Sequence, residues 1–333
     1  MISKPDRRKF LSRLTFAGAG VSLAGTTFTF FPVENKKPAL LGGTKAHPEP
    51  FPAWPVTGKR EAAGMAEVLQ SKKWGRLNGK EVASFENEFK EWTGARHCLG
   101  VSSGTSALFT ALGVLDIGPG DEVIIPVYTF VATYNVVVLN YALPRFVDTN
   151  IETFQIDTDK IEKAVTQNTR LIMPVHIGGS PADMDSVMDI AGKHNIPVLE
   201  DACQAHLAEW KGKKVGTIGL AGAFSFQSSK NLNSGEGGAV ITNDDRFAKN
   251  AFNFHNQSRA EYDVTSNYRS SRGTNLRLTE FQGRLLKEQM SRLQEQAKRR
   301  THNAQYLTGL LNDIPGIYPA KLHPGVTQSA YHL

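Results

Sequence analysis

Three short stretches of the sequence carry residue types whose spacing can do chemistry. The first is residues 102–108, SSGTSAL, where a glycine lies among hydroxyl-bearing side chains. It follows an expected strand and begins an expected helix, so free N–H groups and the positive end of the helix dipole can bind an anion there. An ordinary strand-to-helix turn has the same composition. The stretch matches neither the P-loop nor the dinucleotide-binding glycine pattern.

The second stretch is residues 200–206, EDACQAH, directly after the apolar residues 196–199. Asp201 is therefore expected at the carboxyl end of a buried strand, where α/β folds bind ligands. A carboxylate in that position can hold a protonated ring nitrogen, because the two opposite charges keep each other ionised. The alternative is a carboxylate that caps a helix or lies on the rim of the sheet.

The third stretch is residues 223–232, AFSFQSSKNL, followed by GEGG at residues 235–238. Lys230 comes immediately after an expected buried strand, where its ammonium group is poorly solvated. Poor solvation lowers the pKa of a lysine and favours imine formation with an aldehyde. Taken alone, Lys230 would be interpreted as an ordinary surface lysine, because lysines are common.

The elements that must position these residues alternate between residues 94 and 243. Strands are expected at residues 98–101, 122–126, 145–147, 171–175, 198–200, 223–226 and 239–242. Helices are expected at residues 106–115, 131–139, 161–165 and 184–194. This alternation predicts an α/β domain with a mostly parallel sheet covered by helices.

A long helical segment is expected after residue 275. Leu286, Met290, Leu293 and Ala297 recur at helical spacing and form one apolar stripe, with charged residues between them. Such a stripe predicts a helix that packs against a core rather than one that binds a ligand.

In this order and at these separations, the three stretches resemble the DegT/DnrJ/StrS family of sugar aminotransferases, which depend on pyridoxal 5'-phosphate (PLP). Residues 181–185, PADMD, and 330–333, AYHL, also match the family, and the resemblance begins near residue 40. It implies the PLP-transferase fold type I, with a mostly parallel sheet sandwiched by helices and a smaller C-terminal α+β domain. Family members continue for several tens of residues past this end, so the small domain is expected to be incomplete.

The resemblance assigns the reactive residues. Lys230 matches the Schiff-base lysine, and Asp201 matches the partner of the pyridine nitrogen. Gln204 matches a residue near the ring oxygen of the cofactor. Phe130 falls where the family places an aromatic ring over the pyridine face, and a core phenylalanine is the alternative.

The resemblance also assigns the phosphate site. Gly104, Thr105 and Ser225 match the phosphate cradle within the chain. A residue near 275 is expected to cross a dimer interface to the phosphate of the neighbouring subunit. Asn275 is the first choice for this residue and Arg277 the alternate, so a homodimer is predicted.

The function implied is a PLP-dependent transamination, typical of amino sugar biosynthesis. The amino donor would be glutamate or glutamine, and the acceptor a keto-sugar or a keto-cyclitol. A PLP-dependent sugar dehydratase is disfavoured, because that branch has histidine in place of Lys230. A catalytically silent PLP-binding sensor and a nicotinamide dehydrogenase are further alternatives; the latter lacks its glycine fingerprint.

Charge and cysteine content exclude other classes. The chain of 333 residues has net charge +6, but its first thirteen residues hold five basic side chains and one acidic one. The rest of the chain is nearly neutral and shows no basic stripe, so nucleic-acid binding is not expected. Cys98 and Cys203 are expected to be free thiols, and no metal site is predicted.

The first 32 residues are expected to be a targeting segment rather than part of the fold. Arg7 and Arg8 precede Lys9, Phe10 and an apolar run, which resembles a twin-arginine export signal. The prediction is export to the periplasm or a membrane tether through this segment, with a cytoplasmic location as the alternative. The expected domains are residues 1–32 (signal or anchor), 33–300 (N-terminal segment and large PLP-binding domain) and 301–333 (start of the small C-terminal domain).

Overall fold

The structure is a computed structural model that describes residues 37–259 and 272–329. The chain divides into two compact units at Pro52. The described part of the first unit contains one short 3-10 helix, η1 (Ala39–Leu41). The predicted export signal at residues 1–32 lies outside the described residues. Within the described ranges, no helix is both long enough and apolar enough to cross a membrane.

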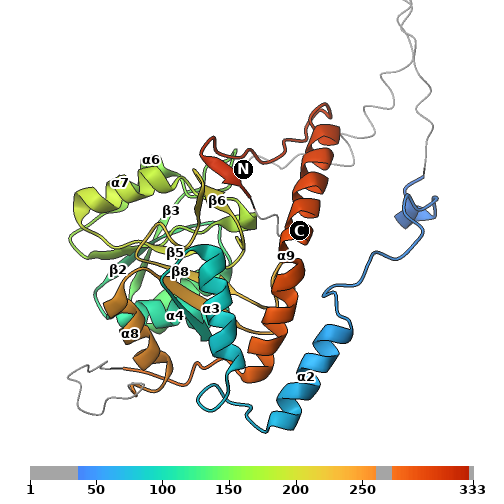
Figure 1. Cartoon of the computed structure of the whole chain (residues 1–333). Coiled ribbons are helices and arrows are strands. Elements are labelled where there is room, and N and C mark those ends of the chain that lie inside the picture. The colour runs from blue at the N-terminus through green and yellow to red at the C-terminus, as the bar shows by residue number, and fades with distance from the viewer. Residues whose placement is uncertain (1–36, 260–271, 330–333) are drawn as a thin grey trace, which may run out of the picture. The chain divides into compact units, whose positions relative to one another are not determined.

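The second unit is built around strands in the order β3-β2-β4-β5-β8-β9-β1. Their bounds are β1 His97–Val101, β2 Glu122–Pro126, β3 Leu143–Val147, β4 Thr169–Ile172, β5 Leu199–Asp201, β8 Ala221–Ser225 and β9 Gly238–Thr242. Two parallel bridges, Ile172 to Val198 and Val175 to Asp201, join the β3-β2-β4 group to the β5-β8-β9-β1 group. Figure 1 shows these strands at the centre of the unit.

The sheet is mostly parallel, as the sequence predicted. Only β9 is antiparallel to its neighbours: it pairs Gly238 with Ser225 of β8 and with Val101 of β1. All seven predicted strands are present within about two residues of their expected bounds, apart from the early end of β4 at Ile172. The predicted fold class is therefore confirmed.

Helices cover both faces of this sheet. They are α4 Gly104–Val114, α5 Val131–Leu139, α6 Thr158–Ala164, α7 Met184–His194 and α8 Asp245–His255, with the 3-10 helix η2 at Ile177–Gly179. Because strand side chains alternate between faces, Ile124 packs in one buried cluster and Ile125 in the other. The first cluster includes residues of α7, and the second includes residues of α4, α5 and α8.

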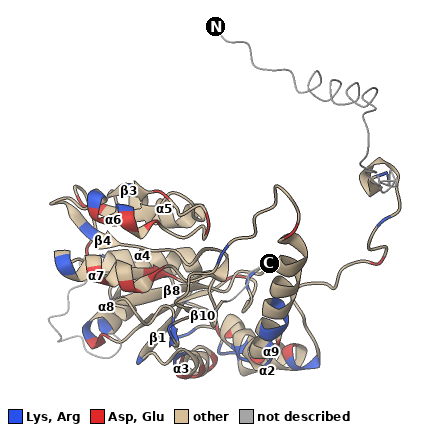
Figure 2. Cartoon of the chain, turned by 90° about the horizontal axis from the view of Figure 1, so that it is seen from above, with Lys and Arg blue, Asp and Glu red and all other residues tan. Residues whose placement is uncertain are grey.

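Three more helices pack at one side of the sheet: α2 Lys59–Ser71, α3 Glu81–Thr93 and α9 Glu280–Leu311. The four stripe residues Leu286, Met290, Leu293 and Ala297 are buried, as their spacing predicted. In the second unit, α2 and α9 run side by side (Figure 1). Figure 2 shows that the charged residues lie mainly along the helices, while the strands between them are mostly uncharged.

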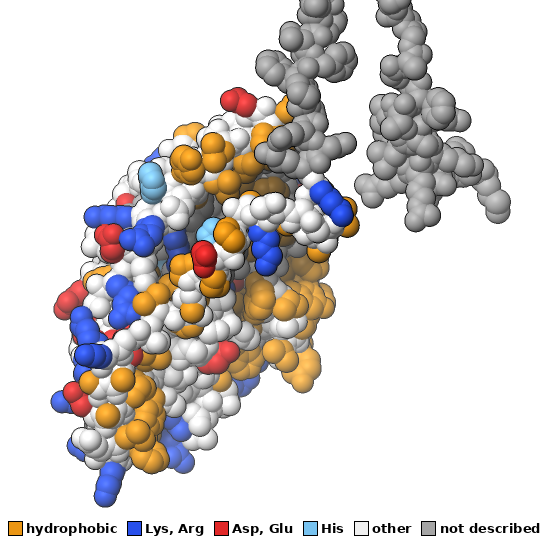
Figure 3. Space-filling view, turned by 90° about the vertical axis from the view of Figure 1, so that its right-hand side faces the viewer, with side chains coloured by type: hydrophobic (Ala, Val, Ile, Leu, Met, Phe, Trp, Pro, Cys, Tyr) orange, Lys and Arg blue, Asp and Glu red, His pale blue; other side chains and the backbone are white. Residues whose placement is uncertain are grey.

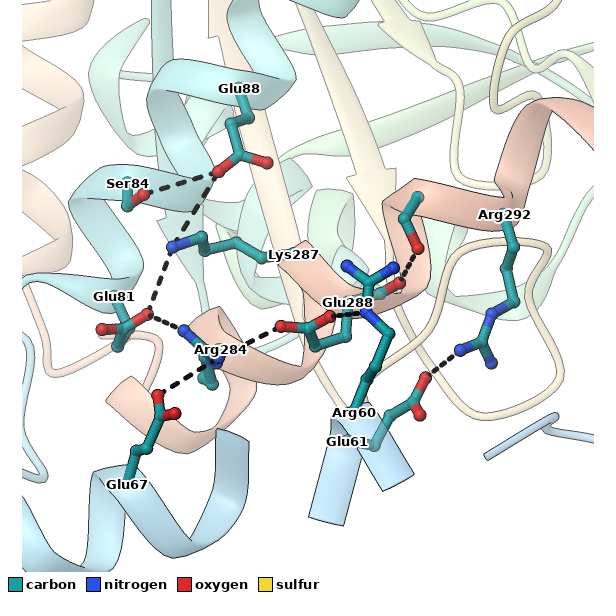
Figure 4. A network of polar contacts seen from close by, with 11 residues as sticks. Arg60, Glu61, Glu67, Glu81, Ser84, Glu88, Arg284, Lys287, Glu288 and Arg292 are labelled. Atoms are coloured by element: carbon teal, nitrogen blue, oxygen red, sulfur yellow. Dashed lines mark hydrogen bonds and ion pairs between the residues drawn. The ribbon is translucent and has the colours of Figure 1, made fainter. Parts of the chain in front are cut away.

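Charged residues join α2, α3 and α9 (Figure 4). Arg284 of α9 forms ion pairs with Glu67 of α2 at 3.2 Å and with Glu288, one turn along its own helix, at 3.2 Å. It also lies 3.6 Å from Glu81 of α3, which Lys287 contacts at 3.3 Å. One arginine therefore links all three helices.

A small antiparallel sheet completes the unit, with β6 Glu209–Trp210, β7 Lys213–Lys214 and β10 Val326–Gln328 in the order β10-β6-β7. It brings a segment near the end of the chain beside the residues that follow the EDACQAH stretch. The domain boundary predicted at residue 300 falls inside α9 and stays a prediction, as does the one at residue 32.

Candidate active site

A cavity of about 440 Å³ lies at the carboxyl ends of the parallel strands. It opens where β5 and β8 end and where β1 turns into α4, which is the edge at which α/β folds bind ligands. Seven of the eight residues predicted for the cofactor line it, from four separate parts of the chain: Gly104, Thr105, Phe130, Asp201, Gln204, Ser225 and Lys230.

Lys230 follows β8 in a tight loop. Phe226 N–H donates to the Gly237 carbonyl at 2.7 Å, and Ser228 N–H donates to the Gly235 carbonyl at 2.8 Å. Gly235 and Gly237 have φ of 85° and 152°, which glycine adopts without strain. The sequence GEGG therefore closes the loop and places the lysine over the cavity.

The side chain of Lys230 is only 9% exposed. Burial lowers the pKa of its ammonium group, and the nearby Cys203 and Asp201 oppose this only in part. Its Nζ lies 5.9 Å from the centre of the Phe130 ring. None of the described residues forms an ion pair with Nζ, so a larger fraction of this lysine is a neutral amine near neutral pH than for a lysine in water.

Asp201 is the last residue of β5 and is buried. Thr133 Oγ1 donates to Asp201 Oδ2 at 2.7 Å, and Cys203 N–H donates to Oδ1 at 3.2 Å. The backbone of Asp201 is also fixed, because its N–H donates to Pro174 and its carbonyl accepts from His176. Burial, followed by the Asp201 carboxylate, raises the pKa of the Cys203 thiol, which therefore stays protonated.

Gln204 lies on the loop after β5. Its Oε1 accepts a hydrogen bond from Gly178 N–H at 2.8 Å. Since the backbone nitrogen can only donate, this contact fixes the orientation of the amide and leaves its NH₂ group as a donor.

At the α4 end of the cavity, the backbone of the helix N-terminus packs closely against neighbouring side chains. Ser103 caps α4 by accepting from Ser106 N–H at 3.0 Å, and Gly104 begins the helix. A Cβ at residue 104 would lie 2.6 Å from Ser225 Cβ and 2.9 Å from Cys203 Sγ. Residue 104 must therefore be glycine, and the helix N-terminus with its positive dipole end packs directly beside Ser225.

A fully buried carboxylate supports the floor of the site. Glu200, the neighbour of Asp201, accepts from the backbone N–H groups of Gly216, Ile218 and Gly219, each at 2.7 Å. His176 Nδ1 accepts from Ala182 N–H, so its Nε2 carries the proton and donates to Glu200 at 3.1 Å. Glu200 thus ties β5 to the two loops around it.

Neither Asn275 nor Arg277 lines this cavity, although Arg277 forms a bridge with Val101 at the end of β1. Asn275 is exposed and bridges to Asn256 beyond α8, while Arg277 donates to Asn256 Oδ1 at 2.9 Å. Asn275 was predicted for the site of a neighbouring subunit, so its role stays a prediction.

Eight lining residues were not predicted as site residues: Ser103, Leu108, Ala132, Val175, Cys203, Gln227, Ser229 and Glu236. Gln227 and Ser229 precede the lysine in the FQSSK stretch, so their place in the sequence was the available indication. Glu236 lies in the GEGG loop. Thr133, which contacts Asp201, lies in the first turn of an apolar helix and carries no such indication.

The model of the DegT/DnrJ/EryC1/StrS aminotransferase family matches residues 55–333. The chain is 40% identical over 271 residues to 3-amino-5-hydroxybenzoate synthase of Amycolatopsis mediterranei (strain S699), covering 81% of this chain and 70% of that protein. It is 36% identical over 314 residues to L-glutamine:2-deoxy-scyllo-inosose aminotransferase of Streptomyces kanamyceticus, covering 90% and 73%.

Solved structures give the same result. The crystal structure of 3-amino-5-hydroxybenzoic acid (AHBA) synthase matches with a TM-score of 0.81 at 38% identity, covering 85% of this chain and 74% of that one. Escherichia coli GDP-4-keto-6-deoxy-D-mannose-3-dehydratase, solved with bound hydrated PLP, matches with a TM-score of 0.76 at 26% identity, covering 84% and 77%.

Proposed function

Because this chain belongs to the DegT/DnrJ/EryC1/StrS aminotransferase family, we propose that it transfers an amino group from an amino acid to a keto-sugar or keto-cyclitol. Its cofactor is PLP. The family predicted from the three sequence stretches is thereby confirmed. The observation that carries the proposal is a buried lysine of lowered pKa and a buried carboxylate in one cavity.

The described residues fit PLP. The α4 N-terminus offers N–H groups and a positive dipole end to a phosphate, and the absence of a Cβ at Gly104 keeps that cradle tightly packed. Lys230 offers an amine for the aldehyde, and Asp201 a negative charge for the pyridine nitrogen. When bound, PLP supplies an electron sink for the electrons left behind as the α-proton of an amino donor departs.

Each residue then has a defined task. Lys230 would bind the aldehyde carbon covalently through Nζ and, as a free amine, move the α-proton of the donor as base and then acid. Asp201 would keep the proton on the pyridine nitrogen. The Gln204 NH₂ group would donate to the ring oxygen, and Phe130 would cover one face of the ring. Gly104, Thr105 and Ser225 would hold the phosphate.

The choice of acceptor and donor rests on the relatives. One is named for 2-deoxy-scyllo-inosose and L-glutamine, which are a keto-cyclitol and an amino-acid donor. Lys230 disfavours the dehydratase alternative, because the dehydratase branch of the family has histidine in place of this lysine.

We further propose a homodimer. Large hydrophobic side chains are exposed along α5 and β3 and in the loops beside them, among them Val127, Tyr128, Val131, Tyr141, Leu143, Phe146 and Ile151. Tyr128 contacts Phe154, and Tyr134 stacks on Phe146, so some of these exposed side chains pack against one another. Soluble monomers rarely expose such a patch, and Phe130 connects it to the cavity. Figure 3 shows hydrophobic side chains gathered on the molecular surface.

We also propose that the protein is exported through the twin-arginine route, on the basis of Arg7, Arg8 and the apolar run that follows. This route carries folded proteins, so PLP can be bound before export. Replacing both arginines by lysine should retain the protein in the cytoplasm, as measured by cell fractionation. A wild-type protein found wholly in the cytoplasm would contradict the proposal.

The proposed function is tested by titrating PLP into the apoprotein and then adding donors and acceptors. We expect a visible absorption band and a covalent, borohydride-fixed label on the peptide that contains Lys230. With L-glutamine or L-glutamate, the wild-type protein should aminate a keto-cyclitol or keto-sugar. Lys230→Ala should lose both the label and the activity and remain folded. A label at the same peptide in this variant would refute the assignment.

A further inference from the structure

The carboxylate of Asp201 is held by two donors, and one of them is a side chain without a predicted role. Thr133 Oγ1 lies 2.7 Å from Asp201 Oδ2, and Cys203 N–H lies 3.2 Å from Oδ1. Thr133 is 0% exposed, so no water reaches its hydroxyl from the surface. The shorter of the two hydrogen bonds to this carboxylate therefore comes from the first turn of α5.

The hydroxyl protons have a single consistent arrangement. An ionised carboxylate only accepts, so the one proton of Thr133 is donated to Asp201. Thr129 Oγ1 lies 2.7 Å from Thr133 Oγ1, and this contact then requires Thr129 as donor. The competing contact of Thr129, with the Phe130 carbonyl, is longer at 3.4 Å. The two threonines thus form a directed chain of hydrogen bonds that ends on Asp201.

The same residue is bonded to the aromatic side of the cavity. Thr133 N–H donates to the Phe130 carbonyl at 3.0 Å, and Phe130 is the N-cap of α5. The Phe130 ring lines the cavity near Lys230 Nζ. Thr133 therefore joins the residue over one face of the cavity to the carboxylate at its floor through two hydrogen bonds.

We propose that Thr133 is a positioning residue for the transamination. Its hydroxyl fixes the rotation of the Asp201 carboxylate, and its backbone N–H holds Phe130 in register with that carboxylate. Each oxygen of Asp201 keeps a further lone pair for a ring nitrogen. The inference rests on the proposed function, because Asp201 has this task only if the chain holds PLP.

The test separates the hydroxyl of Thr133 from its methyl group. Thr133→Val keeps the shape and removes the hydroxyl, whereas Thr133→Ser keeps the hydroxyl and removes the methyl. Thr110→Val is the matched control: Thr110 is also 0% exposed and helical, but its hydroxyl has no hydrogen-bond partner among the described residues. Asp201→Asn marks the full loss of the carboxylate.

We expect Thr133→Val to lower kcat between about tenfold and a hundredfold, the range for a misplaced catalytic group. KM for donor and acceptor should stay within about twofold, because the substrates are not bound by this hydroxyl. The pH at which the absorption band of bound PLP changes should also shift in Thr133→Val. The shift should be in the same direction as in Asp201→Asn. Thr133→Ser and Thr110→Val should match the wild type in all three measurements.

Two outcomes overturn the inference: Thr133→Val that behaves as wild type, or Thr133→Ser that is impaired as strongly as Thr133→Val. If Thr133→Val behaves as wild type and the wild type transfers amino groups, the proposed function still holds. If the wild type neither binds PLP nor transfers amino groups, the proposed function fails. Even then, the apoprotein tests the hydrogen bond between Thr133 and Asp201. The melting temperature of Thr133→Val should lie several degrees below that of Thr133→Ser, because the valine leaves a buried carboxylate with one donor fewer.

Discussion

Lys230 is buried although a protonated lysine prefers water, and this conflict defines the site at the scale of single residues. Burial is the first cause of its lowered pKa, and none of the described residues neutralises the charge through an ion pair. A desolvated charge of this kind destabilises the fold that contains it. Sites that need a reactive group commonly carry such a cost in stability.

Lys230→Met is therefore expected to stabilise the apoprotein at neutral pH, by on the order of 1 kcal/mol. The pKa of Lys230 in the folded state lies below its ordinary value of 10.5. Between these two values the unfolded chain binds more protons, so wild-type stability rises with pH in that window. The advantage of the variant should be constant below the window and disappear as the pH reaches 10.5.

Denaturant unfolding of the apoproteins across this pH range checks the prediction. Lys163→Met, at an exposed lysine of α6, is the control and should give no such gain. An advantage of Lys230→Met that grows as the pH rises would have the wrong sign and would exclude a desolvated charge as its cause.

At the scale of elements, β5 and its two loops depend on Glu200. This carboxylate accepts three backbone N–H groups and the His176 Nε2 proton while it is 0% exposed. A glutamine would have the same shape, but its NH₂ group would face donors and leave backbone N–H groups unpaired.

Glu200→Gln should lower the free energy of unfolding by about 2–4 kcal/mol. It should also weaken PLP binding, because Asp201 and Gln204 follow on the same strand and loop. The control is Asp245→Asn, which alters another histidine–carboxylate pair, with His97, in which the carboxylate is largely exposed. Equal loss of stability in both variants would show that burial of the Glu200 pair is unimportant.

The sequence predicted some elements closely and missed others for physical reasons. β2, α5 and α7 have the predicted bounds, because each is an uninterrupted apolar or amphipathic run with clear ends. β6 and β7 have two residues each and carry no periodicity of their own. They pair with each other over two residues, and β10, more than a hundred residues later, adds to the β6 edge.

Some residues of the site could likewise be predicted from the sequence, and others could not. The three stretches together identified Lys230 and Asp201, because a family pattern fixes their order and spacing. Thr133 could not be found, since a threonine in an apolar helix looks like any other helical residue until α5 lies beside β5. Glu236 was missed because the glycines of GEGG by themselves explain that pattern as a loop, so the glutamate between them indicated no role in the site.

At the scale of the whole molecule, the proposed dimer predicts that two inactive proteins complement each other. Lys230→Ala and Asn275→Ala subunits, mixed and allowed to exchange, would form hybrids in which one of two sites is intact. Random exchange should then restore about a quarter of wild-type activity, because half of the dimers are hybrids.

Activity measured before and after exchange checks this, with each variant alone as the baseline. If the mixture has only the summed activity of its parents, the site does not cross the interface through Asn275. Repeating the exchange with Arg277→Ala distinguishes the two candidates for the crossing residue.

The pairing of β1 with β9 has a consequence for how the protein is made. Val101 pairs with Gly238, so β1 leaves the ribosome 137 residues before its partner. Until then the α4 turn has no Lys230 loop opposite it, and one edge of β1 stays open to other chains. Long-range pairing of this kind is slow and prone to aggregation. A nascent chain therefore has no cofactor site to fill until β9 is synthesised, and chaperones that cover open strand edges should raise its yield more than added PLP does.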